Sequence, residues 1–293
     1  MKIKLMTVVV FILSFTLSEI FAQGENVFPC PMGEGWVLDK EHSDEFNARK
    51  LDDTKWWDFN PFWHGRKPAY FSRENVWVKG GMLLLTAKEQ DPAKTSVENK
   101  VRGFDKFTTA TVKSKDRIRY GYFEARCKSM KAGVCNAFWL YDPLNEDKKY
   151  QKGSFSEEID IFEVFGKPTI KELERVCFAT VHRNATPYVE SLVRDPFPGL
   201  PDKSSAPVMP FDFYEDFHVY ALLWTPSEMI WYVDGKEVHR RNNDYYTTAL
   251  HIMFACEIME SWAGLPDPAD LPATFYIDYL RVWRLKEDSS RSF

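Results

Sequence analysis

Short runs of β-forming residues separated by turns recur along the chain, and this pattern constrains the fold more than any other feature. Polar and apolar or aromatic side chains alternate in residues 107–113 and 121–128, as in strands with one buried face, whereas residues 137–141 form a short apolar run. The runs lie at residues 75–78, 82–87, 107–113, 121–128, 137–141, 176–184, 217–224, 229–233, 236–240, 251–256 and 275–285. Turns such as Lys79-Gly80-Gly81 and Asp234-Gly235 join neighbouring runs. Because helical signals are scarce, the sequence predicts an all-β sandwich.

The amino-terminal segment differs in character from the rest of the chain. Lysines at positions 2 and 4 precede an apolar run, residues 6–17, that is too short to span a membrane. We interpret residues 1–22 as a secretory signal peptide, so the mature protein is expected to be exported, either periplasmic or secreted. No repeat, low-complexity tract or linker follows, and residues 23–293 are predicted to form a single domain.

Composition narrows the possible partners. The net charge of −5 gives no overall attraction to nucleic acid or to an anionic membrane, so we expect neither partner after removal of the signal peptide. The aromatic content of 16% suggests ring-lined surfaces, which suit sugars; the alternative is a core rich in Phe and Trp.

The cysteines and histidines give no sign of a metal site. The odd number and scattered spacing of the cysteines match neither a metal module nor a disulfide framework. They are Cys30, Cys127, Cys135, Cys177 and Cys256. Buried free thiols are expected, with a Cys127–Cys135 pair as the alternative. No histidine cluster has metal-ligand spacing, so no metal and no cofactor are expected.

Three carboxylates lie among β-formers near the middle of the chain, at Glu158, Asp160 and Glu163. In a strand Glu158 and Asp160 share a face, because successive side chains alternate. Glu163 joins them only if one extra residue is absorbed as a β-bulge, which we place around Ile161-Phe162; bulges are common next to active sites. The acids would then line one wall of a cleft. Hydrolysis of a glycosidic bond requires two such carboxylates, one to attack or activate water and one to protonate the leaving oxygen.

The same stretch also permits another interpretation. Glu158, Phe162 and Phe165 are at helical spacing, as on a solvated acidic helix. The β-branched and aromatic residues from 159 to 165, closed by Gly166, argue against a helix. Spacing alone leaves the catalytic interpretation open.

An aromatic and basic stretch, residues 54–68, has no periodicity and is predicted to be a loop. Loops carry binding residues more often than core strands do. The candidate substrate contacts here are Asn60, Trp63 and Arg66; the alternative is a packed loop without a binding role.

Several segments together resemble glycoside hydrolase family 16. Residues 158–163 match the bulged form of the family's Glu-x-Asp-x-x-Glu signature, and residues 121–126, 216–226, 230–235 and 276–283 are similar to other strands of the family. The resemblance implies a β-jelly-roll sandwich of two curved antiparallel sheets with a concave substrate cleft, and a glycoside hydrolase catalytic domain at residues 23–293. It also implies hydrolysis with retention, with Glu158 as nucleophile, Glu163 as acid/base and Asp160 as their electrostatic partner.

The bulged signature resembles the branch of agarases, porphyranases and carrageenases, and also some laminarinases. Residues 60–71 are similar to a loop that forms a wall of the cleft in agarases and porphyranases. Agarases tend to carry Gly-Pro-Gly where this chain has Arg66-Lys67-Pro68. A guanidinium suits a sulfate ester, which favours β-1,4 bonds of the sulfated galactan porphyran over unsulfated agarose. The alternative is that Arg66 pairs with a nearby Asp such as Asp58.

Further contacts are expected from Trp139, His182, Arg183 and Glu257. Trp139 precedes the acids and is, with Trp63, a candidate stacking platform. His182 is alternatively a hydrogen-bonded core residue. The expected partner is a galactan, porphyran or agar, bound by a monomer. A β-agarase is the second hypothesis and a κ-carrageenase or laminarinase the third. A carbohydrate-binding protein without catalysis is disfavoured, because both glutamates are present.

Overall fold

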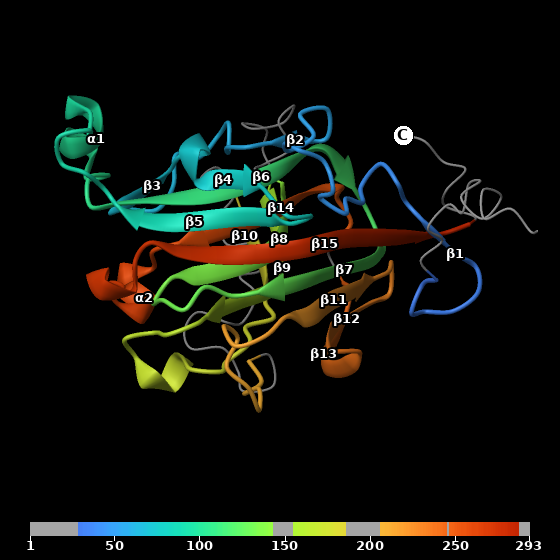
Figure 1. Cartoon of the computed structure of the whole chain (residues 1–293). Helices are drawn as coiled ribbons and strands as arrows, with labels where there is room; N and C mark the ends of the chain where they lie inside the picture. Colours follow the sequence, from blue (N-terminus) through green and yellow to red (C-terminus); the bar gives the residue numbers. More distant parts are fainter. Residues whose placement is uncertain (1–28, 143–154, 186–205, 245, 287–293) are drawn as a thin grey trace, which may run out of the picture.

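The computed structural model describes residues 29–142, 155–185, 206–244 and 246–286. Strands run side by side through the described part, and the two short α-helices lie at one end (Figure 1). These helices are α1 (Val97–Arg102) and α2 (Glu260–Ala263). Single 3₁₀ turns occur at Arg73–Asn75, Lys171–Leu173 and Pro268–Asp270. The all-β prediction is confirmed. Among the described residues, no helix has the length and apolarity needed to cross a membrane.

The strands follow the runs of the sequence closely. Their bounds are β1 Trp36–Leu38, β2 Trp56–Trp57, β3 Ala69–Phe71, β4 Val76–Val78, β5 Leu83–Glu89, β6 Phe107–Ile118, β7 Gly121–Lys128, β8 Cys135–Asp142, β9 Phe155–Phe165, β10 Val181–Ala185, β11 His218–Trp224, β12 Glu228–Val233, β13 Lys236–Asn242, β14 Leu250–Glu257 and β15 Ala273–Leu285. Both predicted hairpins are present, β4 with β5 and β12 with β13.

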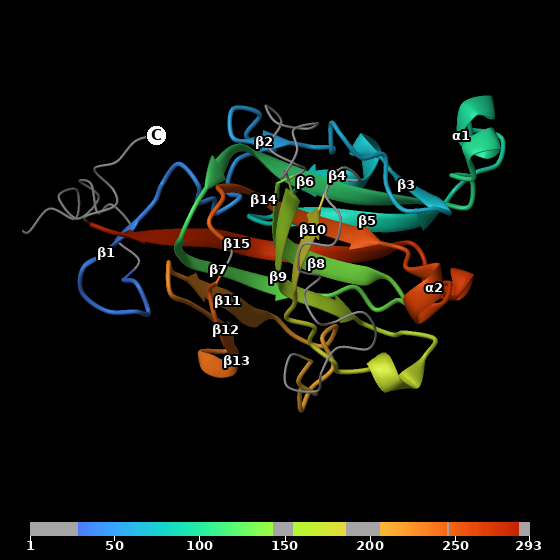
Figure 2. The same cartoon turned by 180° about the vertical axis from the view of Figure 1, so that it is seen from behind.

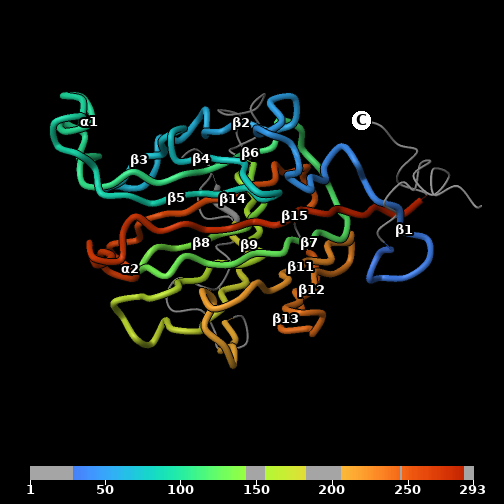
Figure 3. The backbone as a smooth tube through the Cα atoms, viewed as in Figure 1, coloured from blue at the N-terminus to red at the C-terminus, as the bar shows by residue number. Residues whose placement is uncertain are grey.

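One hydrogen-bonded path, β10-β9-β8-β14-β6-β5-β15-β7-β11-β12-β13, connects most strands, and β1 to β4 pair along its sides. β5 and β6 pair near one end, at Lys88 with Thr108 and at Glu89 with Phe107. The sheet curls over at this junction into two layers, which Figure 2 shows from behind and Figure 3 as a backbone tube. The predicted sandwich of two curved, essentially antiparallel sheets is confirmed; among the described strands β3 pairs with β6 in parallel.

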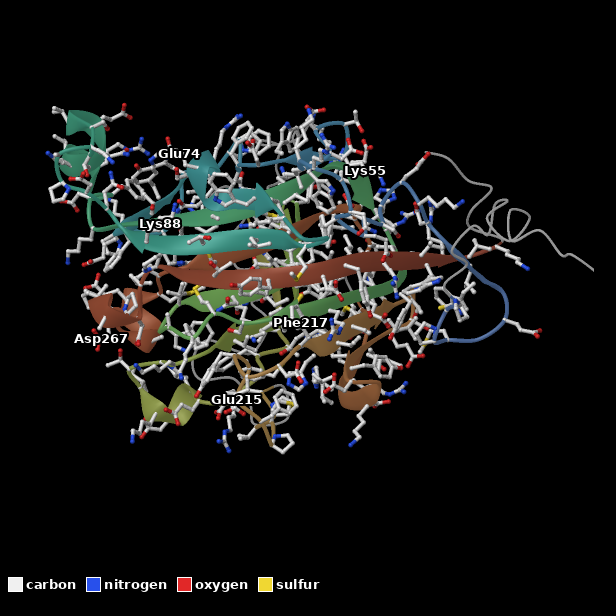
Figure 4. The ribbon with its side chains drawn as sticks, viewed as in Figure 1. Lys55, Glu74, Lys88, Glu215, Phe217 and Asp267 are labelled. Carbon is white, nitrogen blue, oxygen red and sulfur yellow. The ribbon has the colours of Figure 1, made fainter. Side chains whose placement is uncertain are left out.

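Aromatic rings join the two layers. Phe162 of β9 lies 4.0 Å from Tyr220 of β11 and 6.1 Å from Phe275 of β15, measured between ring centroids. All three are buried in the main hydrophobic core. Side chains fill the space between the layers in Figure 4, where the labelled Glu215 and Phe217 lie by the side of β11, and Lys55 and Glu74 lie at the opposite edge. The face of β9 that points away from this core is therefore available for a site.

Some predicted bounds were wrong. Residues 176–184 are not one strand: Val176 and Phe178 form isolated bridges, and β10 begins at Val181. The physical reason is the bulge in β9, where an unmatched residue interrupts the ladder. The 54–68 loop contains the short strand β2. The interpretation of residues 1–22 and most of the expected loops at 142–153 and 193–213 lie outside the described residues.

The five cysteines are all buried and free, as expected, so the alternative Cys127–Cys135 pair is wrong. The two residues lie on different strands, Cys127 on β7 and Cys135 on β8. Burial raises the pKa of both thiols well above the usual range, which keeps them protonated.

Candidate active site

The pairing of β9 with β8 contains the predicted bulge. Asp160 pairs with Trp139 and Phe162 pairs with Phe138, so Ile161 has no partner on β8. The side chains of Ile161 and Phe162 both enter the core, which two successive residues of a regular strand cannot do. The bulge prediction is confirmed.

Because of this extra residue, Glu158, Asp160 and Glu163 face the same cleft. The cleft has a volume of about 350 Å³ and lies over β8, β9 and β14, which are neighbours in the sheet (Figure 2). The predicted residues that line it are Asn60, Trp63, Arg66, Trp139, Glu158, Asp160, Glu163 and Glu257. The structure therefore brings together side chains from a loop and three strands; the role of each remains a prediction.

Hydrogen bonds hold Asp160 in the middle of the wall. The Thr180 hydroxyl donates to the Asp160 carboxylate, and His182 Nε2 lies 3.4 Å from Asp160 Oδ2. The indole N–H of Trp231, from the other layer, donates to the backbone oxygen of Asp160 at 2.8 Å. Asp160 is thus fixed from both sides of the sheet. His182 pairs with Glu158 across β9 and β10, and its side chain is 44% exposed, which argues against the alternative of a hydrogen-bonded core residue.

Burial and mutual repulsion set the charges of the wall. Burial and the neighbouring Asp160 raise the pKa of Glu158 to about 8, and the same causes raise the pKa of Glu163 well above its usual range. The hydrogen bond with Asp160 raises the pKa of His182 to about 10, so this imidazole is a cation at neutral pH. The wall therefore combines two glutamates whose raised pKa values favour the protonated form with one cation, His182, beside Asp160.

Arg66 stands across the cleft from the acids, and its partner differs from the one considered from sequence. Arg66 Nε donates to Glu257 Oε2 at 2.9 Å, whereas Asp58 is held by Arg73 at 3.2 Å. The alternative pair of Arg66 with Asp58 is therefore wrong. The Arg66 side chain is 48% exposed and that of Glu257 only 5%. Burial raises the pKa of Glu257, and the Arg66 guanidinium opposes part of that rise.

Aromatic side chains line part of the remaining cleft surface. Trp63 meets Trp139 edge to face, with ring centroids 6.4 Å apart, and the Arg66 guanidinium carbon lies 5.6 Å from the Trp63 ring centroid. Trp139 Nε1 is buried without a hydrogen-bond partner among the described residues.

Sequence reasoning missed several lining residues. Tyr141 pairs with Glu158 and follows Trp139 by two positions, so strand alternation could have identified it. Phe62 belongs to the loop that was predicted to form a wall of the cleft, whereas Lys113 and Met259 gave no such signal, because only the tertiary fold brings them to the cleft. Lys113 Nζ lies 4.4 Å from the centroid of the Phe62 ring.

Arg183 was also predicted to contact the substrate. Arg183 belongs to β10 and pairs with Glu157 through the backbone, but its side chain lies outside the described residues.

Glu158, Asp160 and His182 each offer one ligand atom within 4.8 Å of the others, so this group could hold a metal ion. The sequence spacing did not predict this group, because His182 lies on the next strand. That the chemistry needs no metal remains a prediction.

Comparison with known proteins gives a consistent result. The sequence model "Beta-porphyranase A-D, GH16 domain" matches residues 36–285. The kappa-carrageenase of Pseudoalteromonas carrageenovora is 29% identical over 269 residues, which are 86% of this chain and 65% of the carrageenase. The chain thus spans just under two thirds of that relative. Beta-porphyranase B of Phocaeicola plebeius is 26% identical over 285 residues, with 89% and 88% covered.

A solved structure also resembles the fold. The crystal structure of a beta-porphyranase from the human gut bacterium Bacteroides plebeius superimposes with a TM-score of 0.71. The two chains are 24% identical, and the match covers 86% of this chain and 93% of the other. This similarity supports the two-layered sandwich.

Proposed function

Because the chain belongs to glycoside hydrolase family 16 and is a polysaccharide hydrolase of the porphyranase, agarase and carrageenase type, we propose that it is an endo-acting β-porphyranase that cleaves β-1,4-galactosidic bonds with retention. One observation carries the proposal: three acids on the β9 wall face a loop wall that presents Trp63 and Arg66. Acids for hydrolysis and a cation for a sulfate ester thus share one cleft.

The proposed reaction has two steps. In the first, Glu158 attacks the anomeric carbon while Glu163 gives its proton to the leaving oxygen, so that a glycosyl ester forms and the new end of the polysaccharide departs. In the second, Glu163 accepts a proton from water, whose oxygen attacks the same carbon and releases Glu158. Two inversions leave the configuration of the sugar retained.

Charge coupling suits this exchange of roles. The Glu158 carboxylate is one of the groups that raise the pKa of Glu163, and ester formation removes its charge. The pKa of Glu163 should then fall, which changes this residue from an acid to a base. Asp160 lies between the two and, held by Thr180 and His182, keeps its position through both steps.

Arg66 is the residue proposed to bind the sulfate ester. Its guanidinium is half exposed beside Trp63, so a galactan stacked on the indole would place substituents within its reach. The Arg66–Glu257 ion pair favours a second candidate function, β-agarase, because Glu257 already neutralises Arg66 and neutral agarose would leave that pair intact.

Parallel assays of reducing-end release test the proposal. Porphyran, agarose, κ-carrageenan and laminarin are incubated with the enzyme at equal mass concentration, and the anomer formed first is followed by NMR. We expect the fastest release from porphyran, with the β-anomer as first product. Activity on agarose with none on porphyran would transfer the assignment to the second candidate, and the α-anomer as first product would refute retention.

The proposal also includes the setting of the enzyme. We propose export, with residues 1–22 removed as a signal peptide, and a single catalytic domain at residues 23–293 that acts as a monomer. Amino-terminal sequencing of the exported protein and light scattering would check these points.

A further inference from the structure

A second groove, of about 500 Å³, lies outside the cleft where the segment before β2 meets β4. Lys55 and Glu74, labelled at one edge of Figure 4, come from the two segments that border it. The groove is open to solvent through Arg49, Lys50 and Trp77, which are exposed. It is therefore accessible to a ligand without any movement of the chain.

Trp77 gives the groove an aromatic surface. Val76 and Val78 on the same strand pack against the main core, so alternation turns Trp77 outward, where it is 56% exposed. Tryptophan is highly buried on average, and an exposed large apolar surface beside polar groups is typical of a ligand-binding groove. The flat faces of a galactose ring suit such an indole.

The charge of the groove contrasts with that of the whole chain. Three cations line it, Arg49, Lys50 and Arg73, with two carboxylates, Asp53 and Asp58, whereas the chain carries −5. Lys50 pairs with Asp53 at 3.0 Å and Arg73 with Asp58 at 3.2 Å. Arg49 has no ion-pair partner among the described residues. A local excess of positive charge beside an indole is complementary to a sulfated polysaccharide.

The groove and the cleft share a wall. Asp58 lines the groove, and Asn60 and Phe62, from the same loop, line the cleft. One loop thus separates the two sites, and a long polymer held in one has the other close by. This arrangement favours a polysaccharide over a small ligand as the occupant.

We propose that this groove is a second, non-catalytic binding site for the galactan, with Trp77 as its stacking platform and Arg49 as its contact for sulfate. The identity of the ligand rests on the function proposed above. The site increases the local concentration of polymer at the cleft and contributes nothing to the hydrolysis of oligosaccharides too short to reach it.

Affinity electrophoresis tests the site in the full chain carrying Glu158→Gln, which prevents digestion of the gel polysaccharide. Migration is compared in native gels with porphyran, with agarose and without polysaccharide. Trp77→Ala is expected to weaken the apparent affinity about threefold to tenfold in both polysaccharides, because one aromatic platform is lost. Arg49→Ala should weaken the affinity for porphyran more than for agarose. Ile170→Ala, a change at another exposed apolar residue, serves as the control and should migrate as the parent does.

Equal retardation of Trp77→Ala, Arg49→Ala and their parent would overturn the proposal even if the enzyme hydrolyses porphyran. Trp77-dependent retardation without hydrolysis of any galactan by the Glu158 form would instead refute the proposed function and leave the groove as a galactan site. In the catalytic form, Trp77→Ala should lose more rate on long porphyran than on a tetrasaccharide; equal losses would refute a separate site. If Trp77→Ala only converts a dimer to a monomer, the groove binds a second copy and the proposal is wrong.

Discussion

The two walls of the cleft are built in different ways. The wall of Glu158, Asp160 and Glu163 comes from one strand, and its arrangement follows from strand alternation plus one bulge. The opposite wall depends on Arg66, whose position is fixed by Glu257, 191 residues further along the chain. The proposed chemistry of the site is therefore locally encoded, whereas the proposed substrate preference depends on a contact that only the complete fold creates.

Replacing Glu158, the proposed nucleophile, tests the acid wall most severely. Glu158→Gln removes the attacking oxygen anion but preserves the shape of the side chain, so kcat on porphyran should fall about 10⁴-fold or more. Binding measured by affinity electrophoresis should persist. The control is Glu260→Gln, an exposed carboxylate outside the cleft, which should keep the parental rate. Near-parental turnover by Glu158→Gln would remove the catalytic role from this wall.

The charge balance within the same wall predicts a change in pH dependence. His182 lowers the pKa of Glu158, so His182→Gln should raise that pKa. As the proposed nucleophile, Glu158 must be ionised to attack, and the acidic limb of the kcat/KM profile should therefore move to higher pH. If the limb moves by about one in pH, the rate measured at a fixed pH on that limb should fall about tenfold.

His218 provides a matched control for the shift of the acidic limb of the kcat/KM profile. His218 forms a comparable pair with Asp234, at 2.8 Å on the other layer, and His218→Gln should leave the acidic limb in place. A movement to lower pH in the His182 variant, or equal movements in both variants, would contradict the assigned role.

A substitution in the loop wall should lower kcat/KM on porphyran and on agarose by different factors. Arg66→Ala removes the proposed sulfate contact, so kcat/KM should fall about tenfold more on porphyran than on agarose, if the charged hydrogen bond contributes about 1.5 kcal/mol. Arg102→Ala, which breaks an exposed pair with Glu98 on α1, is the control and should change neither rate. Equal losses on both substrates would make Arg66 a structural residue.

The smallest expected effect is that of Arg66→Ala on the pH dependence of the free energy of unfolding. Arg66 lowers the already raised pKa of Glu257, so Arg66→Ala should raise it further above the unfolded value of 4.5. A carboxyl with a raised folded pKa destabilises the protein as pH rises from the unfolded pKa to the folded one. Urea unfolding of Arg66→Ala should therefore show a steeper loss of stability above pH 4.5 than the parent shows. Adding Glu257→Gln to Arg66→Ala should reduce this loss of stability without abolishing it, because Arg66 also lowers the pKa of Glu158.

The sequence predicted most of what depends on neighbouring residues. Runs of β-forming residues identified most strands, though not β1, β2 and β3, and the acid spacing located the bulge around Ile161-Phe162. It could not predict the partner of Arg66, because Asp58 is nearer in sequence but is taken by Arg73. It also missed the break before β10, since this follows from the bulge in the neighbouring strand, and the groove at Trp77, where β4 was identified but its surroundings were not.

The bulge also bears on which insertions and deletions the chain tolerates. Adding or removing a residue normally exchanges the two faces of a strand beyond that point. At Ile161 the outcome differs, because loss of this residue would give a regular strand in which Phe162 still faces the core and Glu163 still faces the cleft. β9 can therefore change its length by one residue at this position and keep its three acids aligned, so that mutation can alter the core beneath the acids without dismantling them.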